Sequence, residues 1–243
     1  MCAVAGHLDR ELERAKLDAL KELAYGASHE INNPLANIAA RAQTLLVDEE
    51  DSERARKLAA IHRQAMRAHE MISDLMLFAR PPKLVAKAFD LRELAARVVR
   101  ELDELSQEYG LELCCDAGDS PVEVVADETQ IGVAISAVVK NAVEAAGQGG
   151  HVGVATRVIE EGGVRLAEVC VSDDGPGISD NERRHMFDPF FSGREAGRGL
   201  GFGLSKCWRI VTDHGGDVIV HTSKQGAEIC IHLPLTSHAT ISS

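Results

Sequence analysis

With 243 residues, the chain is long enough for one large hydrophobic core or two modest ones. Its 45% hydrophobic and 26% charged residues are typical of a globular protein. A net charge of −12, with lysine and arginine dispersed along the chain, argues against electrostatic binding to nucleic acid. No apolar run approaches the roughly 20 residues that span a bilayer, and residues 1–6 do not resemble a signal peptide. We therefore expect no nucleic-acid partner and no membrane insertion by this chain.

The cysteines contain no Cys-x-x-Cys pair. There are six, at Cys2, Cys114, Cys115, Cys170, Cys207 and Cys230. Such a set is typical of reduced thiols in the cytoplasm, where cysteine fills small spaces in a core. The spacing favours neither a disulfide framework nor a zinc site. We therefore expect a cytoplasmic protein whose cysteines are unpaired.

The first third of the chain has the pattern of two long helices. Apolar residues recur in steps of three and four over residues 9–47 and again over residues 52–80. The acidic segment 48–53 predicts a solvated turn, in which Asp51 or Ser52 caps the second helix. The apolar stripes are narrow, so these helices bury little surface alone. Pairing two antiparallel hairpins into a four-helix bundle would cover the stripes, and we therefore expect a homodimer.

The pattern changes at Pro81 and Pro82, because proline removes a backbone donor and disfavours helix in the preceding residue. We place a domain boundary near residues 81–88. Beyond it, Glu161-Gly162-Gly163 predicts an antiparallel hairpin. The expected helices cover residues 91–109, 127–146 and 204–214, and the expected strands cover residues 111–115, 122–126, 152–159, 164–172, 217–223 and 227–233. This order predicts a multidomain protein, in which an all-α hairpin precedes an α+β domain and not a doubly wound parallel sheet.

The first helix carries a candidate nucleophile. Neutral imidazole has a free lone pair on one ring nitrogen and can attack phosphorus at neutral pH. Attack through Nε2 of His29 leaves a proton on Nδ1, for which Glu30 is the adjacent acceptor. Asn33 lies one turn later on the same face, where its amide can position a water molecule. A His-Glu pair in a helix is common by itself, so this interpretation depends on a nucleotide pocket elsewhere in the chain.

Two later segments offer parts of a nucleotide pocket. Asn141, near the end of a predicted helix, offers a neutral amide oxygen to Mg²⁺. Asp173 comes after an apolar strand, where its carboxylate can accept a hydrogen bond from an exocyclic amine. Gly175 and Gly177 then let the backbone approach a flat ring. Each of these signals is weak alone, but their order along the chain favours a nucleotide pocket.

A glycine-rich run precedes the last predicted helix. Backbone amides in such a loop, with a helix N-terminus behind them, suit a polyphosphate. Phenylalanines at and after Phe187, together with Phe202, would anchor a mobile lid, and Arg194 and Arg198 are the nearest cations for the β- and γ-phosphates. The expected nucleotide-binding residues are Asn141, Asp173, Gly175, Gly177, Phe187, Arg194, Arg198, Gly199, Gly201, Gly203 and Leu204.

Together these residues resemble the transmitter core of a sensor histidine kinase with a HisKA-type dimerisation domain. The similar segments are residues 29–35 for the H box, 140–145 for the N box, 173–178 for the first glycine box, 187–191 for the F box and 199–204 for the second glycine box. The resemblance covers about residues 15–234, and five motifs in the correct order are highly specific.

The resemblance implies a Bergerat-type ATP-binding sandwich like that of gyrase, Hsp-type chaperones and mismatch-repair ATPases. It implies a dimerisation and histidine phosphotransfer hairpin at residues 1–86, an ATP-binding catalytic domain at 87–236 and a flexible tail at 237–243. The implied cofactors are ATP and Mg²⁺. The implied reaction is autophosphorylation of His29, and then transfer to an aspartate of a response-regulator receiver domain in two-component signalling.

The resemblance also implies individual roles. Glu30 would serve as base, Asn141 would hold Mg²⁺, Asp173 would read adenine, and Asn33 matches the position associated with dephosphorylating the regulator. The sequence departs from the family pattern at four places. A second asparagine is frequent at Ala137, a small hydroxyl residue at Leu200 and lysine at Arg194, and Gly197 is an additional glycine before the second glycine box.

Two other interpretations stay open, a net phosphatase of the regulator and a non-catalytic nucleotide-binding scaffold. Because no sensor or receiver pattern is present, we expect a separate sensor domain or sensory partner.

Overall fold

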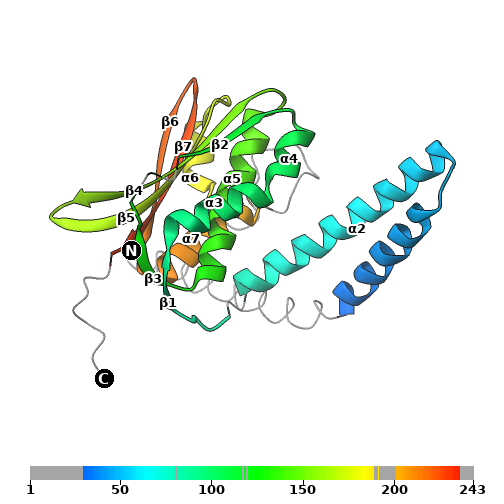
Figure 1. Ribbon diagram of the computed structural model, residues 1–243, viewed down its shortest axis with the longest axis horizontal. Coiled ribbons are helices and arrows are strands. Elements are labelled where there is room, and N and C mark those ends of the chain that lie inside the picture. Colours follow the sequence, from blue (N-terminus) through cyan, green and yellow to red (C-terminus); the bar gives the residue numbers. More distant parts are fainter. Residues whose placement is uncertain are drawn as a thin grey trace, which may run out of the picture. The chain divides into compact units, whose positions relative to one another are not determined.

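A computed structural model describes residues 30–79, 82–116, 118, 120–188, 191 and 201–235. The chain divides into two compact units, Met1–Pro82 and Lys83–Ser243 (Figure 1). Among the described residues, no helix has the length and apolar character that crossing a membrane requires.

The first unit is a helical hairpin. The described part of its first helix covers residues 30–47, and α2 covers Ser52–Ala79. Oδ1 of Asp51 accepts the backbone N–H groups of Glu53 and Arg54 at 2.8 and 3.0 Å, which satisfies two donors at the start of α2. The predicted cap and second helix are therefore confirmed.

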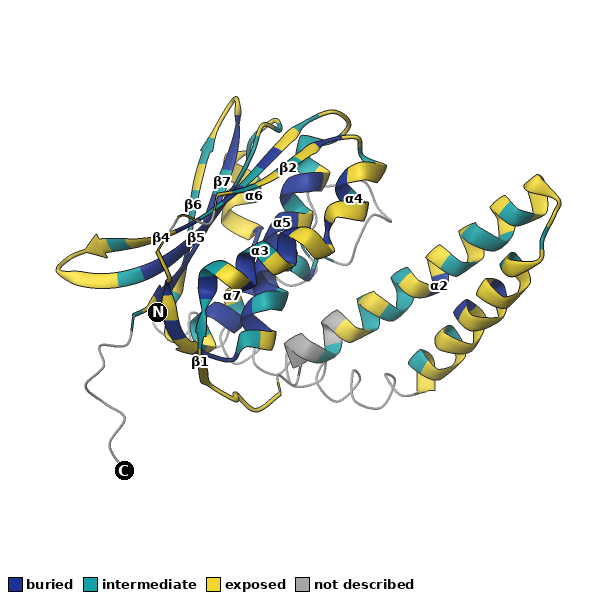
Figure 2. Ribbon diagram, in the orientation of Figure 1, coloured by how far each residue is buried: buried dark blue, intermediate teal, exposed yellow. Residues whose placement is uncertain are grey.

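The buried residues in the described part of the hairpin are small. Ala39, Ala42 and Ala65 are buried, whereas most of the hairpin surface is exposed (Figure 2). Larger apolar side chains stay in solvent, notably Ile31, Ile38 and Leu45 on the first helix. These three positions are separated by seven residues each, which is the spacing of a coiled-coil stripe. A single hairpin therefore leaves a continuous apolar stripe uncovered.

The second unit is an α+β domain. In chain order its elements are β1 (Lys87–Asp90), α3 (Leu91–Glu101), α4 (Asp103–Glu108), β2 (Glu112–Asp116), β3 (Glu123–Ala126), α5 (Glu128–Ala146), β4 (His151–Glu161), β5 (Val164–Asp173), α6 (Asp180–His185), α7 (Gly203–Asp213), β6 (Asp217–Ser223) and β7 (Gly226–Pro234). The main sheet has the order β2-β4-β5-β7-β6, in which only the β2–β4 pair is parallel. Strands β1 and β3 form a separate antiparallel pair.

Helices α3, α5 and α7 lie along the same side of the main sheet (Figure 1). Alternate residues of the central strands face this layer, and Val169, Val171, Ile229 and Ile231 are at most 3% exposed. Burying a branched aliphatic side chain of this kind stabilises a fold by roughly 1.5–3 kcal/mol. The core therefore lies between the helices and one face of the sheet.

The predicted α+β architecture is confirmed. Both ends of each predicted strand lie within two residues of the ends of an observed strand. The helix predicted over residues 91–109 is instead two helices that meet at Leu102. Strand β1 and helix α6 were not expected, since each is too short for hydrophobic periodicity to reveal it. Helix α6 does carry a local signal, because Ser179 and Glu182 form a capping box.

Asp127 ties three parts of the second unit together. Its carboxylate accepts the backbone N–H groups of Gln130 at 3.1 Å and Val85 at 3.0 Å, and its own N–H donates to Nε2 of His214 at 3.0 Å. Because Nε2 accepts this bond, the ring proton sits on Nδ1, which donates to the carbonyl of Ile210 at 2.7 Å. Burial opposes the charge on Asp127, but the backbone hydrogen bonds outweigh it and lower its pKa. The beginning of α5 is thereby fastened to the end of α7.

The cysteine prediction was wrong, because Cys170 and Cys230 form a disulfide. These two residues are direct partners in the β5–β7 register, although 60 residues separate them in the chain. Cys114 is exposed and so is not core filler, whereas Cys207 is buried as expected, and burial raises the pKa of its thiol to about 12. Spacing along the chain does not show which residues a sheet register places opposite one another.

The loop after β5 packs closely against β6 at Gly177. Its φ is +77°, and a Cβ there would lie 2.0 Å from the carbonyl oxygen of Ser223. Gly163, in the β4–β5 turn, has a matching φ of +79° with nothing within 4 Å of a Cβ. We expect Gly163→Ala to lower the free energy of unfolding by about 1 kcal/mol through backbone strain alone, and Gly177→Ala to lower it clearly more. Urea unfolding measures both, and equal losses would show that the contact with Ser223 does not constrain the loop.

Candidate functional site

The end of β5 meets the last turn of α5 at a contact that admits only glycine. A Cβ on Gly175 would lie 2.7 Å from the carbonyl oxygen of Ala145 and 2.8 Å from Oδ1 of Asp173. Asn141 lies one helical turn before Ala145 and on the same face of α5. The structure therefore brings the N-box face of α5 and the first glycine box together.

Asp173 and Asp174 have different environments, although they are neighbours. The half-buried carboxylate of Asp173 accepts the backbone N–H of Gly175 at 3.0 Å and a second backbone N–H from Ala227. Burial raises its pKa, and these two hydrogen bonds only partly offset that effect. Asp174 is exposed, and its Oδ1 accepts the backbone N–H of His151 at 2.9 Å. Asp173 is thus the carboxylate held partly out of water, as recognition of a ligand by hydrogen bonding requires.

The loop after Gly177 is anchored to β6 before the chain enters α6. The backbone N–H of Ile178 donates to Oγ1 of Thr222 at 2.7 Å. Beyond α6, Met186 is buried and Phe187 is half-buried, so the F-box segment starts from a packed anchor. Nδ1 of His185 lies 2.7 Å from a carboxylate oxygen of Asp188. The position of Phe187 is therefore set by packing on the domain.

The second glycine box ends at the N-terminus of α7. Gly201 has a φ of +71°, Phe202 is 2% exposed at the N-cap, and α7 begins at Gly203. A phenylalanine has no acceptor atom, so this N-cap side chain makes no hydrogen bond to the first turn. A helix N-terminus of this kind suits an anion. Leu204 lies in the first turn and is half-buried.

The remaining predicted site residues divide into two groups. Glu30 and Asn33 are exposed on the described part of the first helix. His29, Arg194, Arg198 and Gly199 lie outside the described residues.

Sequence reasoning missed the role of Asp127 and His214. The helix expected to begin at Asp127 was identified, but the hydrogen bond to His214 joins positions 87 residues apart. An aspartate before a helix signals a cap, whereas nothing local signals its distant partner.

The observed groups fit a nucleotide with its metal ion. The half-buried Asp173 carboxylate offers an acceptor for an amine, and Asn141 lies on the helix face that the same loop contacts. An amide oxygen is a ligand that Mg²⁺ accepts alongside phosphate and water. The uncapped start of α7 adds N–H groups for phosphate.

Two stretches of the chain match known protein families. Residues 126–237 match the family described as histidine kinase-, DNA gyrase B-, and HSP90-like ATPase, and residues 19–83 match the His Kinase A (phospho-acceptor) domain. Sensor histidine kinase ZraS of Klebsiella oxytoca is 30% identical over 224 residues, which cover 91% of this chain and 47% of ZraS.

Two solved structures share the fold at 24% identity each. Full-length ShkA in complex with AMPPNP has a TM-score of 0.73 and is matched over 90% of this chain and 47% of ShkA. ThkA in complex with response regulator protein TrrA has a TM-score of 0.65, over 95% of this chain and 66% of that one.

The fold and the site thus define an ATPase domain of the gyrase and HSP90 class joined to a phosphoacceptor hairpin. The chain belongs to the sensor histidine kinase family, as its transmitter core. It spans about half the length of ZraS.

Burial of Asp173 predicts a pH-dependent effect on stability. A carboxyl group whose pKa is raised by folding makes its full contribution to stability below its unfolded pKa, and that contribution is lost as pH rises through the folded pKa. Asp173→Asn, which mimics the neutral form, should therefore raise the melting temperature at pH 7, and the gain should shrink as the pH falls toward about 4.

Thermal unfolding across this pH range measures the effect, with Asp174→Asn as the exposed control that should show no comparable gain. A stability loss in Asp173→Asn at pH 7 would contradict the assignment of a desolvation cost to Asp173.

Proposed function

We propose that the chain is an ATP-dependent protein-histidine kinase that phosphorylates itself on His29 and passes the phosphoryl group to an aspartate of a response regulator. The observation that carries this proposal is the contact of the Asp173 loop with the α5 face that bears Asn141, in a chain whose hairpin matches a phosphoacceptor domain. A nucleotide site and an acceptor histidine in one chain are the parts that the reaction needs.

On this proposal the nucleotide is held by groups from several helices, strands and loops of the second unit. Asp173 accepts a hydrogen bond from the adenine amine, with Gly175 and Gly177 shaping the loop beside the ring. Asn141 holds Mg²⁺, which neutralises phosphate charge. Phosphate oxygens are bound by Arg194, Arg198, Gly199 and the N–H groups of residues 201–204, and Phe187 anchors the lid.

The imidazole of His29 attacks the γ-phosphorus of ATP, the bond from that phosphorus to the bridging oxygen breaks, and ADP leaves. Glu30 accepts or orients the proton on the other ring nitrogen, so that Nε2 carries the lone pair. Its carboxylate is exposed, which leaves it accessible to the reacting groups. Asn33, also exposed and one turn from His29, positions the water that hydrolyses the regulator's phosphoryl group in the phosphatase direction.

We further propose that residues 1–86 form a homodimer by packing two hairpins into a four-helix bundle, and that residues 87–236 are the catalytic domain. The support is the heptad-spaced stripe of Ile31, Ile38 and Leu45, which are 40–61% exposed in the single chain. An apolar stripe with this spacing is covered when a second copy packs against it.

The proposed partners are a receiver domain and a source of signal. ThkA, which shares the fold, has been solved with a response regulator protein. Because the chain spans about half of ZraS, a sensor domain or sensory protein is proposed as the source of the stimulus. The proposed location is the cytoplasm, where ATP and receiver domains meet.

The kinase proposal is tested by the acid-labile, alkali-stable phosphate that phosphohistidine gives. The chain with Mg²⁺ and γ-labelled ATP should acquire this label, and His29→Ala should lose it because the proposed acceptor is gone. His62→Ala, in α2, is the matched control and should keep the label. Binding of a fluorescent ATP analogue should persist in both variants.

Two other results would favour a different acceptor residue or a non-catalytic protein. Label retained in His29→Ala would overturn the site assignment. Tight binding of the ATP analogue without any phosphohistidine would support the non-catalytic scaffold.

A second experiment tests the phosphatase direction. Asn33→Ala should leave autophosphorylation intact but slow hydrolysis of a phosphorylated receiver domain by about 100-fold, the size typical of lost positioning of a reacting group. Asn37→Ala is the matched control, since Asn37 is an equally exposed asparagine one turn further on. Equal hydrolysis rates in the two variants would remove Asn33 from the proposed mechanism.

A further inference from the structure

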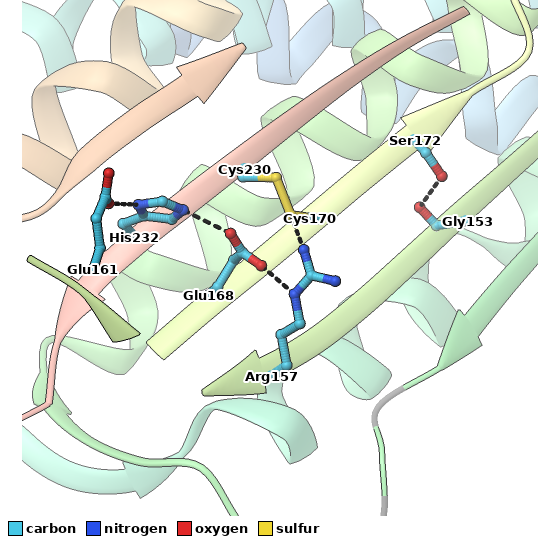
Figure 3. Close-up of a disulfide and its surroundings, with 8 residues drawn as sticks. All are labelled: Gly153, Arg157, Glu161, Glu168, Cys170, Ser172, Cys230 and His232. Atoms are coloured by element: carbon cyan, nitrogen blue, oxygen red, sulfur yellow. Dashed lines mark hydrogen bonds and ion pairs between the residues drawn. A yellow bond between two sulfur atoms is a disulfide. The ribbon is translucent and has the colours of Figure 1, made fainter. Parts of the chain in front are cut away.

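The face of the main sheet that points away from α3, α5 and α7 carries a buried polar cluster. Its members are Glu168 and Cys170 on β5 and Cys230 and His232 on β7 (Figure 3). Their exposed fractions are 5, 4, 2 and 7%, respectively. The catalytic proposal uses none of these side chains, and a buried carboxylate is costly unless a partner compensates it.

The strand register explains why the four side chains meet. Cys170 is the direct partner of Cys230, and Glu168 is the direct partner of His232. The two residues from each strand are two positions apart, so all four project from the same face. Nε2 of His232 lies 2.7 Å from a carboxylate oxygen of Glu168. One carboxylate oxygen and both sulfur atoms lie within 4.8 Å of one another.

We propose that this cluster, with its cysteines reduced, binds one thiophilic divalent cation of the Zn²⁺ type. Two thiolates, one imidazole nitrogen and one carboxylate oxygen are ligand types that zinc takes in tetrahedral sites. The two-residue spacing on each of two neighbouring strands gathers ligand atoms of Glu168, Cys170 and Cys230 without any loop, and His232 adjoins them through its contact with Glu168. The site lies on the opposite face of the sheet from the helices and is independent of the proposed kinase reaction.

The charges around the cluster suit a divalent cation. The guanidinium of Arg157 is hydrogen-bonded to the carboxylate of Glu168, and its Nη2 lies 4.0 Å from Sγ of Cys170. Two thiolates and a carboxylate carry three negative charges, which Arg157 and the cation balance. The carboxylate of Glu161 lies 3.9 Å from Nδ1 of His232, on the ring side opposite to the proposed ligand atom. A carboxylate in that place orients a metal-binding imidazole.

The disulfide and the metal-bound form are alternative states of the same sulfur pair. A thiol or phosphine reductant supplies two electrons, and two protons are taken up, as the Cys170–Cys230 bond breaks to give two thiols. Binding of the cation then releases those two protons, because thiolate is the metal-binding form. The side chain of Arg157 is 61% exposed, so the cluster is separated from solvent by a group that can move.

A second group of possible metal ligands lies elsewhere on the same sheet. Glu112, Cys114 and His151 lie together on β2 and β4 but are all exposed, so they lack the burial that distinguishes the cluster on β5 and β7. Cys207 is no competitor, since among the described residues it belongs to neither group of neighbouring ligand types.

The test is titration of the full chain with Co²⁺ after reduction with a phosphine and removal of the reductant without oxygen. We expect one cobalt per chain, with thiolate-to-cobalt charge-transfer absorption and the intense visible bands of a tetrahedral ion. Zn²⁺ should displace it. Cys170→Ser and His232→Gln should each weaken binding by at least about 10-fold, the lower range for losing even an outer-shell partner. Cys114→Ser is the matched control and should bind as the parent chain does.

The disulfide-bonded form of the unaltered sequence should give no tetrahedral cobalt signal, which tests the site without any substitution. The proposal is overturned if the reduced chain gives no such signal, if the disulfide-bonded form binds equally well, or if Cys114→Ser rather than Cys170→Ser abolishes the signal.

Discussion

The backbone contact between the end of β5 and the last turn of α5 is the constraint on which the nucleotide side of the protein depends. Any side chain at residue 175 would meet the carbonyl of Ala145, so the loop and the helix hold this geometry only with glycine there. Helix α5 is fastened at its other end through Asp127 and His214. A helix held at both ends presents Asn141 and the neighbouring Asp173 from a rigid frame, which lowers the cost of ordering the site when a ligand binds.

The central strand β5 serves two purposes because its side chains alternate. One set, including Val169 and Val171, packs under the helices, while Glu168 and Cys170 belong to the opposite face. The strand then ends at Asp173, whose carboxyl has a raised pKa because it is partly buried. Keeping that charge out of water opposes folding, as is common for binding residues. The well-packed apolar set on the same strand offsets this cost.

The hairpin is held together differently. Its buried side chains are the small ones of Ala39, Ala42 and Ala65, while those of Ile31 and Ile38 are exposed. Close approach of alanines buries little area, so a single hairpin gains little from the hydrophobic effect. The small apolar area buried within one hairpin is consistent with the proposed second copy. It also leaves the exposed carboxylate of Glu30 accessible.

The sequence by itself determined most of the elements, their order and the five motifs, because periodicity, caps and proline breaks are local properties. It missed β1 and α6, which are too short to show a hydrophobic period. It placed Asn141, Asp173 and Gly175 in the same site through their resemblance to a family. Only the tertiary structure decided which strands are neighbours, and therefore that Cys170 lies opposite Cys230 and that His214 accepts the N–H of Asp127. The physical reason is that register is set by packing the whole sheet against its helices, and no short stretch of chain carries that information.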